Sequence, residues 1–328
     1  MKKLSLLLVA VIMGFSFMLT GCGGSDNVIR LNEVTHSIFY APLYVAINEG
    51  YFEEEGLEIE LTNGGGSDKS MTALVSGAAD IALLGPETGV YIAAQGKQDQ
   101  PKVFGQLTRC DGSFIVGREN IENFTLEDLS NKEIIGGRPG GMPAMTLEYV
   151  VKHSNATNVT FNTSIDFNNT TAAFLGGTAD FVTAFEPLAS DIEEQGRGYV
   201  LASVGEISGS VPYTAFMANQ SYLTNHADKA EAFLRAVHKA YLFMTDQNTT
   251  IDQIVDALVP SFKTSSRASI QKSVEAYIRI NAWNSTPVMT EESYNNLIAI
   301  ITEAGKLSEP VAFSKVVDNT IAQKIIAG

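Results

Sequence analysis

The chain has 328 residues, a formal net charge of −15, 45% hydrophobic residues and 18% charged residues. This length exceeds one typical hydrophobic core and predicts two globular domains. An acidic chain without a basic patch is not expected to bind nucleic acid. Two cysteines cannot form a disulfide framework or a Cys-x-x-Cys site, and the four histidines are widely spaced, so we expect no metal and no cofactor.

The first 21 residues have the pattern of a signal peptide. Lys2 and Lys3 precede an apolar run over residues 4–19, which is short for a membrane span. The run ends in Leu19-Thr20-Gly21-Cys22, which resembles the lipobox of bacterial lipoproteins. The resemblance implies lipidation of Cys22, a tether over residues 22–28, and attachment to the outer face of the cell membrane through lipid alone. The alternative is an ordinary signal peptide with a chance cysteine.

The predicted elements that follow alternate between strands and helices. Residues 29–34 and 57–61 have the period of strands, and Pro42 and Gly50 mark the ends of a helix. A glycine-rich loop over residues 63–67 leads into a helix over 68–76 and a buried strand over 80–84. Later, residues 133–137 predict a strand and 144–152 a helix. This alternation is typical of α/β sheets, whereas the helical periods at 225–244, 251–258, 265–280 and 290–304 predict a helical pack laid on the first domain.

One segment occurs twice in the chain. Residues 74–82 read LVSGAADIA and residues 174–182 read FLGGTADFV, so a Gly-x-Ala-Asp pattern recurs at Gly77–Asp80 and Gly177–Asp180. The glycine suits a helix end and the aspartate suits a turn into the next strand, which gives Asp80 and Asp180 structural roles. We interpret the repeat as two equivalent lobes, the alternative being a chance match between two helix ends.

Several ordered motifs together point to a family. They are APLYVA at residues 41–46, EGYFEEEGL at 49–57, SGAAD at 76–80, DLSNK at 128–132 and FEP at 185–187. From about Ile29 to Pro212 the chain resembles the SsuA/THI5-like (NMT1-like) substrate-binding proteins. The resemblance implies a type II periplasmic-binding-protein fold, with two α/β lobes and a central cleft. Residues 29–117 and 213–328 would form the first lobe, residues 118–212 the second, and crossing strands would lie near 111–117 and 211–218. It also implies a monomeric, non-enzymatic receptor that delivers a small molecule to the permease and ATPase of an ABC importer.

Candidate ligand-binding residues follow from strand ends, because open α/β sheets bind ligands beyond the carboxyl ends of their strands. These candidates are His36, Phe39, Tyr40, Gly65, Ser67, Glu87, Thr88, Arg109, Gly140, Gly141, Met142, Phe185, Glu186 and Tyr213. The glycine-rich loops before helices offer N–H groups that favour an anion, or they are simply tight turns.

The two acidic candidates favour the opposite kind of ligand. Glu87 and Glu186 suit an amine, a pyrimidine amino group or a cation, unless each has a purely structural role. A buried carboxylate needs a partner, and we expect Arg109 or Arg138 to provide it. The aromatic candidates, together with Phe167, could stack on a planar ligand.

Three hypotheses for function therefore remain open. The first is a receptor for a planar nitrogen-containing compound such as a pyrimidine-type precursor. The second is an anion receptor of the same family, for a sulfonate, taurine or nitrate. The third is a biosynthetic enzyme of the THI5 type, which is disfavoured because the cysteine-rich motif of such enzymes is missing.

Overall fold

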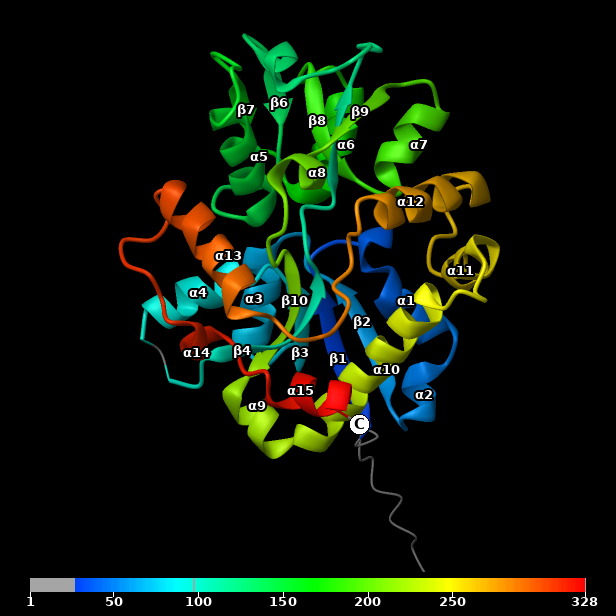
Figure 1. Cartoon of the computed structure of the whole chain (residues 1–328), viewed down its shortest axis with the longest axis vertical. Coiled ribbons are helices and arrows are strands. Elements are labelled where there is room, and N and C mark those ends of the chain that lie inside the picture. The colour runs from blue at the N-terminus through cyan, green and yellow to red at the C-terminus, as the bar shows by residue number, and fades with distance from the viewer. Residues whose placement is uncertain (1–26, 97, 328) are drawn as a thin grey trace, which may run out of the picture.

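The computed structural model describes residues 27–96 and 98–327. The predicted signal peptide, Cys22 and most of the predicted tether lie outside these residues. The chain forms two lobes, one above the other in Figure 1, and each lobe is built on one five-stranded sheet.

The first lobe contains the sheet with strand order β2-β1-β3-β10-β4. Its strands are β1 (Val28–Glu33), β2 (Glu58–Asn63), β3 (Ile81–Leu84), β4 (Pro101–Thr108) and β10 (Thr214–Asn219). Strand β1 runs parallel to β2 and β3, and β10 runs antiparallel to β3 and β4. The helices of this part of the chain are η1 (Ile38–Tyr40), α1 (Ala41–Asn48), α2 (Tyr51–Glu54), α3 (Ser67–Val75) and α4 (Glu87–Ala94).

The second lobe repeats this arrangement with strand order β7-β6-β8-β5-β9. Its strands are β5 (Ser113–Gly117), β6 (Glu133–Ile135), β7 (Thr160–Asn162), β8 (Phe181–Phe185) and β9 (Tyr199–Ser203). Its helices are η2 (Leu126–Leu129), α5 (Met142–Lys152), η3 (Phe167–Asn169), α6 (Thr170–Leu175), α7 (Leu188–Glu194) and α8 (Val204–Ser208).

The repeated Gly-x-Ala-Asp segments occupy equivalent places in the two lobes, before β3 and before β8. The Asp80 carboxylate accepts the Arg30 N–H at 2.9 Å, and the Asp180 carboxylate accepts the Glu133 N–H at 3.0 Å. Each aspartate therefore fastens the start of one strand to its parallel neighbour, which confirms the structural role predicted for both.

Two chain segments cross between the lobes and pair with each other. The Val211 N–H donates to the Arg109 carbonyl at 2.8 Å, and the Tyr213 N–H donates to the Thr108 carbonyl at 3.2 Å. Strand β5 pairs with β8 and β9, so residues 113–117 lie in the second sheet. The sequence predicts the boundary between the lobes after Gly117, but it lies before β5, because β5 belongs to the second sheet.

The C-terminal helices contact both lobes rather than the first alone. They are α9 (Gln220–Asn225), α10 (Ala227–Thr245), α11 (Ile251–Leu258), α12 (Arg267–Arg279), α13 (Glu291–Glu303), α14 (Phe313–Val316) and α15 (Thr320–Ala327). Helix α10 packs on α1 and α2, but α12 packs on α7 and α13 packs on α5 of the second lobe. The Ser269 hydroxyl donates to Asp191 at 2.6 Å, and Lys152 pairs with Glu303 at 2.9 Å. The predicted placement on the first domain is thus incomplete for α12 and α13: α12 also contacts η1 and α13 also contacts α4, but polar side chains tie both helices to the second lobe as well.

Candidate ligand-binding cleft

A cavity of about 420 Å³ lies between the lobes, where the first turns of three helices meet. Ser67 begins α3, Thr88 lies in the first turn of α4, and Gly140 and Gly141 precede α5. All four residues line the cavity, together with Glu87. Helix N-termini present unpaired N–H groups and a partial positive charge to this space. Of the predicted candidates, these five therefore come together around one cavity.

Glu87 is the most unusual group of the cavity, because its carboxyl is fully buried and neither oxygen accepts a hydrogen bond of standard geometry from a described residue. Burial raises the pKa of Glu87 to about 8, against a smaller opposite effect of the backbone N–H groups of Glu87 and Met142. Gly85 makes room for the carboxyl, since a Cβ on Gly85 would lie 2.0 Å from Oε2 of Glu87. A buried polar group without a partner is rare in native proteins and indicates a place for a missing one.

The remaining wall of the cavity is mostly apolar. Val34, Met71 and Ile92 come from the first lobe, and Phe167 comes from the second. Tyr91 also lines it, and its hydroxyl donates to the Gly140 carbonyl at 2.9 Å, from α4 of the first lobe to the second. Such a wall suits the apolar body of a small organic molecule.

The opening of the cavity carries charged side chains from both lobes. Asp68 and Arg138 line the cavity and are 58% and 30% exposed, and their side chains pair at 2.8 Å. Arg138 also lies 3.8 Å from Asp166. The prediction that Arg109 or Arg138 pairs with Glu87 is therefore wrong, because Arg138 is engaged at the rim by two aspartates.

A second interlobe cavity of about 190 Å³ lies on the other side of Phe167, which borders both. Its lining includes His36 from the first lobe and Phe185 and Glu186 from the second. The predicted candidates thus divide between two compartments rather than facing one ligand.

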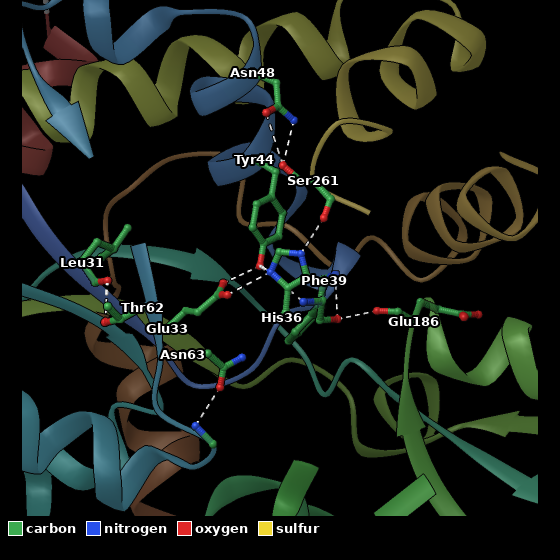
Figure 2. Close-up of polar contacts among 12 residues, drawn as sticks. Leu31, Glu33, His36, Phe39, Tyr44, Asn48, Thr62, Asn63, Glu186 and Ser261 are labelled. Atoms are coloured by element: carbon green, nitrogen blue, oxygen red, sulfur yellow. Dashed lines mark hydrogen bonds and ion pairs between the residues drawn. The ribbon is translucent and has the colours of Figure 1, made fainter. Parts of the chain in front are cut away.

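His36 belongs to a hydrogen-bonded network at the edge of the second cavity (Figure 2). Its Nε2 lies 2.8 Å from the Ser261 carbonyl and its Nδ1 lies 3.0 Å from Glu33, while the Tyr44 hydroxyl donates to the other Glu33 oxygen. A carbonyl and a carboxylate both accept, so this geometry suits a doubly protonated imidazole. Burial lowers the pKa of His36, but the bonds to Glu33 and Ser261 outweigh burial and raise it above its usual value.

Glu186 is buried like Glu87, but its polar atoms are all engaged. Its carboxyl accepts the N–H and hydroxyl of Ser190 at 2.8 and 2.9 Å and the Ser273 hydroxyl at 3.4 Å. Its carbonyl accepts from the Ser37 hydroxyl and, at 3.1 Å, from the Ile38 N–H, across the lobes. Burial raises the pKa of Glu186 to about 7 despite the bonds from Ser190 and Ser273. Glu186 therefore joins α7, α12 and the first lobe rather than facing the larger cavity.

The comparisons with known proteins agree with this architecture. The model of the family described as NMT1/THI5 like matches residues 38–250. A Bacillus subtilis (strain 168) protein named as a binding protein, YtlA, is 40% identical over 314 residues, which cover 94% of this chain and 93% of that protein.

The chain belongs to the NMT1/THI5-like family.

Solved structures confirm the type II periplasmic-binding-protein fold expected of this family. A ligand-binding component of an ABC-type import system from Staphylococcus aureus, with zinc bound, has a TM-score of 0.73 at 18% identity, covering 92% of this chain and 99% of that chain. The alkanesulfonate-binding protein SsuA from Xanthomonas axonopodis pv. citri, bound to MOPS, has a TM-score of 0.72 at 16% identity, covering 89% and 98%.

In this NMT1/THI5-like chain several predicted site residues line neither interlobe cavity. Phe39, Tyr40 and Tyr213 are buried, and the Phe39 ring packs against the rings of Tyr40, Phe185, Tyr213 and Tyr277. Arg109 lies in a crossing segment and Gly65 packs on Asn168. The Met142 side chain is also buried, and only its backbone N–H affects the site, by lowering the pKa of Glu87. The strand-end rule therefore selects loops that border the cavities, but only some of the predicted residues in them line a cavity.

Tyr91 is one of several lining residues that the sequence prediction missed, as are Val34, Met71 and Ile92. Residues one turn apart on a helix share a face, and Tyr91 follows Glu87 by one turn of α4. Placing Glu87 at a helix start would therefore have been enough to add Tyr91 to the candidates.

The described residues also bear on two other possibilities, a metal site and a membrane-spanning helix. Residues 27–96 and 98–327 hold no group of three or more His, Cys, Asp or Glu side chains arranged for a metal ion. None of the helices in these ranges combines the length and apolar character needed to cross a membrane. Cys110 is a free, buried thiol.

Proposed function

We propose that the chain is the solute-binding component of an ABC import system and captures a small planar nitrogen-containing compound, of pyrimidine type, in the larger cavity. The importer role is supported by family membership, by the relative named as a binding protein, and by the similar fold of a ligand-binding component of an import system. The ligand class depends on the chemistry of the cavity.

The single observation behind the ligand class is the unpartnered carboxyl of Glu87 in an otherwise mostly apolar cavity. With a pKa of about 8, this group is mainly a neutral carboxylic acid near neutral pH. A carboxylic acid donates one hydrogen bond and accepts another, and an aminopyrimidine offers the complementary ring nitrogen and amino N–H side by side. Such a pair would satisfy both oxygens without burying a net charge, once the Glu87 side chain turns from the wall toward the cavity.

An anion is the second candidate, because the N-termini of α3, α4 and α5 meet at the same cavity. Helix N-termini favour negative charge. At the start of α4, however, the Glu87 side chain itself lies near the N–H groups, which leaves less room there for an anion. We therefore place simple sulfonates, taurine and nitrate behind the planar compound. The enzyme alternative ranks last, since the sequence has only two cysteines.

We also propose that Cys22 carries the lipid that holds the receptor at the outer face of the membrane. Metabolic labelling with a fatty-acid analogue should modify the wild-type protein and not a Cys22→Ser variant. Equal labelling of both proteins would contradict this assignment.

A thermal-shift screen of the purified protein tests the ligand class, since a ligand that binds only the native state raises its stability with concentration. The probes are 4-aminopyrimidines, flavins, alkanesulfonates, taurine, nitrate and alkylamines. We expect the aminopyrimidines to give the largest shift, and Glu87→Gln to reduce it. Glu309→Gln, an exposed site, is the matched control. Tight binding of an alkanesulfonate with no response to pyrimidines would refute the ligand class, and a flat response to every class would refute the receptor role.

A further inference from the structure

Four charged side chains join the lobes at the rim of the larger cavity. Asp68 and Lys69 lie in the first turn of α3 in the first lobe, and Arg138 and Asp166 lie in loops of the second lobe. Arg138 pairs with Asp68 at 2.8 Å, Lys69 pairs with Asp166 at 2.8 Å, and Arg138 lies 3.8 Å from Asp166. Charges of opposite sign thus alternate across the interlobe boundary, and we call these four residues the clasp.

The backbone of the first lobe is shaped to receive this part of the second lobe. A Cβ on Gly66 would lie 3.0 Å from Cδ of Arg138, and a Cβ on Gly65 would lie 2.8 Å from Nδ2 of Asn168. Two side chains of the second lobe therefore rest on bare glycine backbone. The sequence allowed the glycine-rich loop to be an anion site or a tight turn. In the structure, the absence of Cβ atoms lets the second lobe approach this loop closely.

The clasp also adjoins Phe167, the residue that separates the two cavities. Asp166 and Asn168 flank Phe167, which borders both compartments. The segment that carries Phe167 is thus fixed against α3 by Lys69 and against the glycine loop by Asn168. Loss of the clasp would free the wall of the solute cavity as well as its rim.

We propose that the clasp holds the lobes closed, and that Arg138 acts on solute binding by positioning the lobes rather than by contacting the solute. Arg138 is a rim residue whose guanidinium is occupied by two aspartates, whereas Glu87 inside the cavity has no partner among the described residues. Exposed ion pairs each change such an equilibrium by at most about a factor of five. The clasp, with three such contacts, is therefore strong enough to favour closure and weak enough to release it.

The test measures the distance between the lobes and needs no solute. Spin labels at Glu58→Cys in the first lobe and Glu119→Cys in the second report that distance by pulsed electron paramagnetic resonance, in protein that carries Cys22→Ser. Both label sites are exposed, and Cys110 is buried. We expect one short distance in the parent protein and a second, longer one in Arg138→Ala and in Asp166→Asn. Arg138→Lys, which keeps the charge, should restore part of the closed population.

Two controls distinguish the clasp from a general loss of surface charge. Arg235→Ala removes a similar arginine that pairs with Glu55 at 2.9 Å and with Glu231 at 3.1 Å within the first lobe, and should leave the distances unchanged. Raising the salt from about 0.1 M to about 1 M shortens the screening length from about 10 Å to about 3 Å, and should open the parent protein but add little in Arg138→Ala. Distributions that match the parent in every clasp variant at both salts would overturn the proposal, whatever the solute screen gives.

Discussion

Replacing Glu87 by glutamine tests the central feature of the cavity. Glutamine has nearly the shape of glutamate but cannot ionise, so the change removes the titration and little else. The carboxyl has a pKa of about 8 in the folded protein, against its usual 4.5. Because Glu87 is fully buried, solvent does not screen the cost of ionising it.

The sign of the effect follows from which state holds the proton. Between pH 4.5 and about 8 the folded protein keeps a proton on Glu87 that the unfolded chain has lost. The free energy of unfolding therefore falls as pH rises through this window, and the loss is complete above it. The difference between the two pKa values corresponds to about 5 kcal/mol, at 1.36 kcal/mol for each tenfold change in proton affinity. The Glu87→Gln protein should lack this loss.

Urea unfolding followed by circular dichroism measures the effect directly. The difference in unfolding free energy between Glu87→Gln and the parent should shift in favour of the variant by up to about 5 kcal/mol between about pH 5 and about pH 9. All other groups titrate in both proteins and cancel in this difference. A difference that stays constant to within about 1 kcal/mol would show that Glu87 does not hold its proton, and the neutral pairing with a solute would lose its basis.

Two further variants test the surroundings of the site. His36→Gln should destabilise the protein most at low pH. The folded-state pKa of His36 is raised above 6.5, so its stabilising contribution is present at low pH and is lost as pH rises through that folded-state pKa. Melting temperatures of both proteins at several pH values check this. Gly85→Ala should cost about 1–3 kcal/mol in urea unfolding, because the added Cβ would lie 2.0 Å from Oε2 of Glu87, and an unchanged midpoint would refute the close packing.

The elements of the fold are largely predictable because their signals are local. The predicted strand at 29–34 and helix at 68–76 each differ from β1 and α3 by one residue at either end. The predicted helices at 265–280 and 290–304 correspond to α12 and α13. The repeat around Asp80 and Asp180 predicts equivalent lobes, and in the structure both aspartates accept the same kind of backbone hydrogen bond.

The contacts between elements are less predictable, because they depend on the three-dimensional path of the chain. Nothing near α12 in the sequence shows that Ser269 meets Asp191 on α7. Arg138 was an equally plausible partner for Glu87, and only the structure shows that it turns to Asp68. Residue type and strand position select the loops of the cleft, whereas the direction of each side chain decides which residues face the cavity.

Glu87 and Glu186 show this limit most clearly, since both follow a buried strand and both are buried acids. Glu186 accepts three hydrogen bonds from Ser190 and Ser273, whereas Glu87 accepts none from a described residue. Only Glu87 has capacity left for a solute, so Glu186→Gln should change stability and its pH dependence but leave solute affinity within about twofold. Titration calorimetry with the most stabilising solute of the screen measures this. A loss of affinity in Glu186→Gln as large as in Glu87→Gln would place both acids in one binding site and contradict the division between the two cavities.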